Sequence, residues 1–288
     1  MASEQHGDDL YREVVRANVE LHSRLAADYS SCEPHFRPEN VARVEGRLRE
    51  LFASAGSERL LDLGCGTGFI ISIAKPYVRA ITGVDVTQAM LDRVDRSGPA
   101  RIELHNHDTG TFPAAAAGYD VVTAYSFLHH LYDIGPTLRT AFRALRPGGV
   151  LYADLEPNFY FWEGVGALER GRAYDPIVQR EIEMVTYKDE DIASKFGVDK
   201  EVFNKAEYGK SLAGGFKEEE LRAQLEAAGF RDIAFDYSWF LGQGYLINDA
   251  GYPRAEGLRL AEVAAAVLHK ALPLSRGIFK YLGFTARK

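Results

Sequence analysis

Short apolar segments alternate with amphipathic segments through the middle of this chain. Five apolar runs predict β-strands, and the segments between them carry apolar residues at helical spacing. The strands are predicted at 58–63, 79–85, 101–106, 119–125 and 148–155, with helices at 72–78, 87–94 and 135–146. This alternation favours a parallel sheet with helices on both faces, because hairpins cannot supply the crossover connections. The predicted fold class is therefore α/β.

Two segments lie outside this alternation. Residues 8–55 predict two amphipathic helices joined by a turn, and residues 157–215 mix charges with many aromatic side chains. Those aromatics either line a ligand pocket or bury extra helices against the sheet; they are Phe159, Tyr160, Phe161, Trp162, Tyr174, Tyr187, Phe196, Phe203 and Tyr208. The alternation then resumes with a helix ending at Gly229, a strand at 231–240, a helix at 255–270 and a final strand at 278–288. We expect one core with additions: a helical cap (1–56), the core (57–156), a lid (157–215) and the completion of the core (216–288).

Charge and cysteine content limit the classes of protein that fit. The chain has 288 residues and a formal net charge of -7, which disfavours a broad nucleic-acid or anionic-membrane surface. No apolar run approaches the roughly 20 residues of a membrane span, and the polar, acidic N-terminus is unlike a secretory leader. Cys32 and Cys65 form no zinc or disulfide pattern. We therefore expect a cytoplasmic protein, monomeric or homodimeric, without nucleic-acid or membrane partners.

The segment LDLGCGTGF, residues 61–69, is an apolar strand that breaks into a glycine-rich turn. Its three glycines follow the spacing GxGxG, whereas a dinucleotide-binding turn has GxGxxG and would need a glycine at Phe69. A phosphate-binding P-loop is excluded because no Gly-Lys-Ser/Thr follows. Asp62 would repel a pyrophosphate and suits a cationic group such as an amine. The turn therefore favours a ligand with a positive charge.

A second acid refines this prediction. About twenty residues after the glycine turn the next strand ends in Asp85, and an acid at this place can accept hydrogen bonds from both ribose hydroxyls of a nucleoside. The two acids together indicate a nucleoside with a cationic tail and no phosphates. S-adenosylmethionine (SAM) fits that description.

Five motifs in register resemble those of the class I SAM-dependent methyltransferases. They are LDLGCGTG, VDVTQAML, HDTGTFP, YDVVTAYSFLHHL and LRPGGVLYADLEP, and the resemblance covers roughly residues 60–155. It points to the small-molecule branch that includes the ubiquinone and menaquinone biosynthesis enzymes. The resemblance implies a Rossmann-like, seven-stranded, mainly parallel sheet whose last strand is antiparallel.

The resemblance also implies a set of cofactor-binding residues. Gly64, Cys65 and Gly66 would face the methionine part of SAM, alongside Asp62, and Asp85 would hold the ribose. The remaining implied positions are Val86 and Met90 at the adenine, Asp108 at its amino group with Thr109 nearby, Ser126 beside the sulfonium, and Tyr29 closing over SAM or substrate. For Met90 and Tyr29 the alternative is plain packing in the core or between helices.

The candidates for a catalytic base are His129, His130 and Glu156. The two histidines follow the fourth predicted strand, at the carboxyl edge where ligands bind in open α/β sheets. Adjacent side chains cannot share one direction, and His130 is preferred because the family's second histidine lies nearer the cofactor; the alternative is loop scaffolding. Glu156 follows Asp154 at the end of the fifth strand and would bind a polar substrate, act as base or cap the next turn. No magnesium-binding cluster of acids and amides is recognisable, so we predict no metal.

Taken together, these features predict a SAM-dependent methyltransferase that acts on a small, apolar or aromatic molecule and releases S-adenosylhomocysteine (SAH). O-methylation is favoured over N- or C-methylation because candidate bases are present. The alternatives are an RNA or protein methyltransferase, disfavoured by the absence of a basic tail, and a non-catalytic SAM-binding protein. A nicotinamide-dependent oxidoreductase is disfavoured by Phe69 and Asp62.

Overall fold

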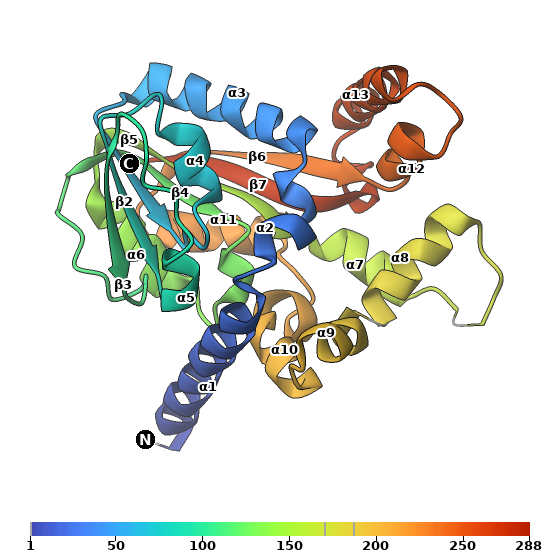
Figure 1. Ribbon diagram of the computed structural model, residues 1–288, viewed down its shortest axis with the longest axis horizontal. Coiled ribbons are helices and arrows are strands. Elements are labelled where there is room, and N and C mark those ends of the chain that lie inside the picture. Colours follow the sequence, from blue (N-terminus) through green and yellow to red (C-terminus); the bar gives the residue numbers. More distant parts are fainter. Residues whose placement is uncertain (1, 170, 187) are drawn as a thin grey trace.

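A seven-stranded β-sheet crosses the molecule in the order β3-β2-β1-β4-β5-β7-β6 (Figure 1). The computed structural model describes residues 2–169, 171–186 and 188–288, so the predicted lid residue Tyr187 lies outside the described residues. β1 to β5 run parallel, whereas β7 is antiparallel to both of its neighbours, β5 and β6. The strands are β1 (Arg59–Leu63), β2 (Ala80–Asp85), β3 (Arg101–Asn106), β4 (Tyr119–Tyr125), β5 (Leu145–Pro157), β6 (Arg231–Phe240) and β7 (Phe279–Arg287). The predicted Rossmann-like sheet is confirmed.

The helices between the strands are shorter than predicted near the glycine turn. α4 (Phe69–Ala74) begins directly after the turn and ends two residues before Pro76, which has no backbone N–H to continue a helix. α5 (Gln88–Leu91) is a single turn, and α12 (Gln243–Asn248), which was not predicted, starts after Gly242 at φ 84°. The remaining core helices, α6 (Gly135–Ala144), α11 (Glu218–Ala227) and α13 (Arg254–Lys270), lie where the apolar spacing predicts them.

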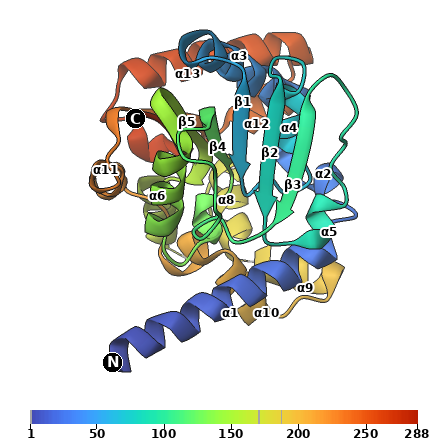
Figure 2. The same ribbon diagram turned by 90° about the vertical axis from the view of Figure 1, so that its left-hand side faces the viewer.

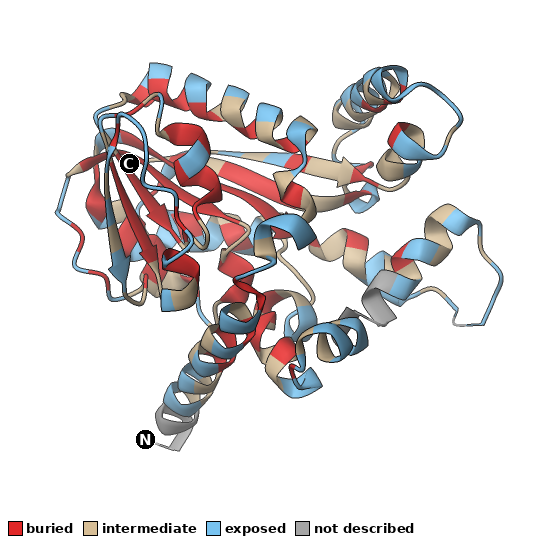
Figure 3. Cartoon of the chain, in the orientation of Figure 1, coloured by how far each residue is buried: buried red, intermediate tan, exposed pale blue. Residues whose placement is uncertain are grey.

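Helices cover both faces of the sheet, and its central strands β1, β2, β4 and β5 are mostly buried (Figure 3). α3 (Pro38–Ala55) and α4 pack on one face, with Val44, Leu48 and Ile71 fully buried. α6 and α11 pack on the opposite face through Leu138 and Leu225. This two-sided cover explains why the central strands are continuous apolar runs rather than alternating patterns.

The first helix packs against the lid. α1 (Ala2–Leu25) runs beside α10 (Lys200–Ala206) in both views (Figures 1 and 2), and together they bury Ala17, Leu21, Leu25, Val198, Phe203 and Ala206. The other lid helices are α7 (Phe159–Gly166), α8 (Pro176–Thr186) and α9 (Lys188–Phe196). A π-helical turn, Tyr208–Leu212, follows α10. The predicted cap and lid therefore meet in a small apolar cluster of their own.

Of the helices that the structure describes, none combines the length and the hydropathy that crossing a lipid bilayer demands.

Candidate active site

A cavity of about 470 Å³ opens at the carboxyl ends of the parallel strands. It lies where the strand order reverses between β1 and β4, the place at which open α/β sheets bind ligands. Its volume falls within the range of small-molecule sites, roughly 300–1,000 Å³. The core supplies most of the wall, and α1 closes one side with Tyr11, Asn18 and His22.

The glycine turn forms the floor of this cavity. Gly64 has φ 69° and packs so tightly that an added Cβ would lie 2.0 Å from Phe127 Cδ2. Gly66 has φ 51°, and its N–H donates to Asp85 Oδ2 at 2.9 Å. These positive φ values and close contacts are ones that residues with side chains would not allow.

Asp62 lies at the bottom of the cavity as a buried acid, only 1 % exposed. Its Oδ1 accepts a hydrogen bond from Thr123 Oγ1 at 2.7 Å. Burial raises the pKa of Asp62 to about 7, against the effect of the Thr123 hydrogen bond, and the nearby Asp85 raises it further. A carboxyl group held this way is ready to pair with an incoming cation.

One buried hydroxyl of a cavity-lining residue has no partner within the described part of the chain. Thr67 Oγ1 belongs to the glycine turn, lines the cavity, and is a buried polar atom without a hydrogen bond in the described part of the chain. A buried hydroxyl without a partner is costly, so such atoms are found where a ligand completes the hydrogen bond. Asp62 thus offers an anion to a cationic group of a ligand, and Thr67 offers a donor that the protein itself leaves unpaired among the described residues.

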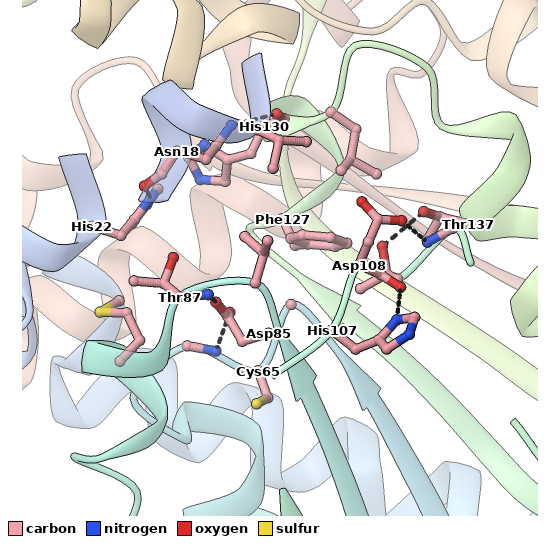
Figure 4. A pocket seen from close by; sticks show the side chains of 18 of the residues that line it. Asn18, His22, Cys65, Asp85, Thr87, His107, Asp108, Phe127, His130 and Thr137 are labelled. Atoms are coloured by element: carbon pink, nitrogen blue, oxygen red, sulfur yellow. Dashed lines mark hydrogen bonds between the residues drawn. The ribbon is translucent and has the colours of Figure 1, made fainter. Parts of the chain in front are cut away.

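Asp85 stands at the end of β2 on the same edge (Figure 4). Its two oxygens accept the backbone N–H groups of Gly66 at 2.9 Å and Thr87 at 2.8 Å. Burial raises the pKa of Asp85, and these hydrogen bonds act in the opposite direction. Each carboxylate oxygen has a second lone pair, so both remain able to accept from a vicinal diol such as a ribose.

The predicted adenine end contains a contact that the sequence did not reveal. Asp108 Oδ1 accepts the N–H of Gly110 at 2.7 Å, while Oδ2 accepts the hydroxyl of Tyr11, from α1, at 2.6 Å. Thr109 bonds Thr137 through their hydroxyls at 2.8 Å (Figure 4). α1 is therefore fastened across this end of the cavity.

The other predicted cofactor residues also line the cavity, namely Tyr29, Cys65, Val86, Met90 and Ser126. Ser126 has φ 50°, an uncommon conformation for a residue with a side chain, and its N–H donates to Asp154 O at 2.8 Å. The Tyr29 ring packs edge-on to Phe36, with ring centres 6.3 Å apart. All of the predicted cofactor positions are thus brought to one cavity.

Of the three predicted catalytic candidates, only His130 lines the cavity. Its Nδ1 lies 2.7 Å from Ala206 O, and because a carbonyl only accepts, Nδ1 carries the proton and Nε2 holds a lone pair. Burial lowers the pKa of His130 well below its ordinary value, and the neighbouring His129 and His22 lower it further. His130 is therefore a neutral imidazole with one free acceptor nitrogen.

His129 and Glu156 are directed away from the cavity into the core. Glu156 is fully buried, and its oxygens accept the backbone N–H groups of Phe127, Leu128 and His129 at 2.9–3.0 Å. Glu156 Oε2 also accepts from His129 Nδ1 at 2.8 Å. The carboxylate thus stabilises the tight turn that carries both histidines, because that turn would otherwise bury unpaired N–H groups.

One group of metal-ligating side chains occurs among the described residues. His129, His130 and Glu207 each place a donor atom within 4.8 Å of the others. The Nδ1 atoms of the two imidazoles bond Glu156 and Ala206. The group is defined by proximity alone, and we assign no metal to it. The absence of a metal stays a prediction.

Several cavity residues were not predicted from the sequence. Tyr11, Asn18 and His22 come from α1, His35 from the segment before α3, and Thr67 from the glycine turn. The α1 residues are separated by seven and four positions, so they share one face of the helix. This row of polar residues on one helical face was the feature of the sequence that could have indicated a cavity wall. His35 is buried among aromatic rings, which lowers its pKa to about 4.

Comparison with known proteins agrees with this geometry. Residues 61–153 match the methyltransferase domain family. A 27-O-demethylrifamycin SV methyltransferase of Amycolatopsis mediterranei is 34% identical over 119 residues, 39% of this chain and 44% of that protein. A ubiquinone biosynthesis O-methyltransferase of Bordetella pertussis is 29% identical over 183 residues, 58% of this chain and 76% of that protein. The chain thus spans less than half of the first relative and about three quarters of the second.

The fold has counterparts among solved structures. Phosphoethanolamine N-methyltransferase 2 of Haemonchus contortus, solved with phosphomonomethylethanolamine and S-adenosylhomocysteine, has a TM-score of 0.57 and 14% identity, covering 97% of this chain and 60% of that one. At this identity the likeness concerns the fold alone. The match over residues 61–153, together with the sheet and the cavity, identifies a methyltransferase domain in this part of the chain. SAM is accordingly its cofactor, and the two cavity acids, Asp62 and Asp85, are chemically suited to a ligand with a cationic group and a ribose diol.

Proposed function

We propose that this protein is an O-methyltransferase that methylates a hydroxyl group of a small organic acceptor. When bound, SAM supplies an activated methyl group: the acceptor oxygen bonds the methyl carbon, the C–S electron pair stays on sulfur, and the acceptor proton leaves to a base. In this proposal Asp62 and Thr67 hold the amino-acid end of the cofactor, and Asp85 holds its ribose. Asp108 holds the adenine. These residues act by fixing position, and alignment alone can supply several kcal/mol.

The observation that carries the choice of oxygen is the contact of His130 Nδ1 with the carbonyl oxygen of Ala206, which leaves Nε2 as the acceptor nitrogen. A phenol or alcohol must lose a proton at or before transfer, and a neutral imidazole with a free Nε2 can take it. The names of the two relatives described above both refer to a methyl group on oxygen, which supports the same choice. His129 and Glu156 serve in this proposal as supports that hold the turn in place. The two free cysteines, Cys32 and Cys65, support a location in the reducing cytoplasm.

The test is the formation of SAH with a panel of hydroxylated aromatic acceptors and their amine counterparts. We expect turnover with hydroxyl acceptors and a loss of about 10²–10⁴-fold in kcat for His130→Gln. SAH binding should be retained in that variant, because His130 is assigned to the acceptor. Turnover with bulk RNA, or binding of SAM without turnover on any acceptor, would contradict the proposal.

A further inference from the structure

Three separate parts of the chain meet at His130. The core supplies the residue itself, in the turn Leu128–His130 after β4. The lid supplies Ala206, whose carbonyl accepts from His130 Nδ1 at 2.7 Å, and the next residue, Glu207, places Oε1 3.8 Å from the same nitrogen. His130 and Glu207 are both buried, each 8 % exposed, so water would not screen a charge on the imidazole from the carboxylate as it would at the surface.

The first helix holds His130 from another side (Figure 4). Asn18 Nδ2 donates to His130 O at 2.9 Å, and the His22 ring packs edge-on to the His130 ring with centres 4.8 Å apart. His22 Nδ1 bonds Asn18 O at 2.9 Å. α1 therefore contacts both the backbone and the side chain of His130.

The lid backbone also rests closely on this turn. A Cβ at Gly209 would lie 2.8 Å from His129 Cα, so this position of the lid tolerates only glycine. Lys205 Nζ pairs with Glu13 of α1 at 2.9 Å, next to the apolar cluster that α1 shares with the lid. The lid and α1 thus reach His130 as one packed unit.

The charges around His130 act in opposite directions. Burial, His129 and His22 all lower the pKa of His130, whereas Glu207 raises it. Glu207 is thus the nearby acid that favours the protonated form of this imidazole. From the core, the Glu156 carboxylate bonds His129, whose ring centre lies 4.1 Å from that of His130.

We propose that Glu207 is a positioning residue for the base, and that His130 can take a proton from an acceptor only while Ala206 and Glu207 of the lid are packed against it. This inference rests on the proposed function of His130. The proton leaves the acceptor oxygen and binds Nε2, and the resulting imidazolium keeps its hydrogen bond from Nδ1 to Ala206. The Glu207 carboxylate stabilises that charge. The lid insertion thereby completes the base as well as covering the substrate.

The first experiment follows the histidine ring signals by NMR as a function of pH in the complete protein without cofactor. The His130 signals are assigned from their loss in His130→Gln. We expect Glu207→Gln to lower the pKa of His130 and His22→Asn to raise it. The matched control is Glu201→Gln, because Glu201 is an exposed acid of the same lid that pairs with Lys205. This control should leave the pKa of His130 unchanged. An unchanged His130 pKa in Glu207→Gln would overturn the proposal.

The second experiment separates positioning from folding. Glu207→Gln should lower kcat about 10- to 100-fold and leave the affinity for SAH unchanged. Because the variant lowers the pKa of His130, the acidic limb of its pH–rate profile should move to lower pH. Glu207→Asp should restore part of the rate. Loss of rate by the same factor at every pH, without rescue, would contradict the proposal. Full activity in His130→Gln would show that the proposed base is wrong. Full activity in Glu207→Gln together with a loss in His130→Gln would contradict only this inference. A stoichiometric divalent metal lost in both His129→Gln and Glu207→Gln would also overturn it.

Discussion

Raising the pH from about 5.5 to about 7.5 should tighten the binding of SAH and SAM to this protein about 25-fold. The cause is Asp62, whose pKa burial raises to about 7. In the cofactor-free protein this carboxyl group is mostly protonated below pH 7 and therefore neutral. An ammonium group favours the carboxylate, so binding must release the proton, and affinity falls as the pH falls through 7.

The magnitude follows from the ionised fraction of Asp62. With a pKa of about 7, about 3% of the carboxyl groups are ionised at pH 5.5 and about 76% at pH 7.5. The ratio of about 25 corresponds to about 1.9 kcal/mol of binding free energy. The pH range of the measurement stays below about 7.7, the pKa of an α-amino group, so the ligand's ammonium group remains mostly protonated throughout.

Calorimetry in two buffers with different ionisation enthalpies measures both the affinity and the number of protons released. With SAH as ligand, we expect about 0.9 proton released at pH 6 and about 0.2 at pH 7.5. Asp62→Asn is the matched variant, because its amide oxygen can still accept from Thr123. It should bind more weakly, release no proton and show no pH dependence over this range.

Two results would refute this reasoning. An affinity that stays flat between pH 5.5 and 7.5 would show that Asp62 is already ionised without a ligand. A pH dependence that survives in Asp62→Asn would assign the titration to another group, and Asp85, whose pKa is also raised by burial, would be the first to examine.

Three further predictions test single contacts. Thr67→Val should stabilise the free protein by about 1 kcal/mol, because it removes a buried hydroxyl without a partner, yet weaken SAH binding about 5- to 20-fold; thermal unfolding with and without SAH measures both. Gly64→Ala should cost about 2–4 kcal/mol of stability, since its φ is positive and its Cβ would overlap Phe127, whereas Gly148→Ala, with φ 78° and open space, should cost about 1–2 kcal/mol; equal losses in denaturant melts would contradict the clash. His35 has a pKa of about 4 in the folded protein and about 6.5 in the unfolded chain. Its contribution to the free energy of unfolding is therefore fully present above pH 6.5 and decreases as the pH falls towards 4. The stability difference between wild type and His35→Gln should therefore shift by about 3 kcal/mol from pH 7 to pH 4, and a constant difference would contradict the assignment.

Periodicity and motif spacing along the chain were enough to place the strands of the sheet and the residues proposed to bind the cofactor. Apolar runs flanked by turn residues locate strands by local periodicity, and the carboxyl ends of parallel strands must share one edge. Residues at or just beyond the carboxyl ends of those strands, such as Asp62, Asp85, Asp108 and Ser126, are therefore brought together by the topology. No knowledge of side-chain packing was needed to group them.

The surroundings of the proposed base His130, in contrast, follow from packing between distant segments. His22 and Asn18 reach the cavity because α1 packs against α10, a contact between segments almost 200 residues apart. Ala206 and Glu207 approach His130 because the lid folds back over the turn that Glu156 stabilises. Such contacts depend on how amphipathic surfaces fit one another, and hydrophobic periodicity specifies that a helix has an apolar face without specifying which partner will cover it.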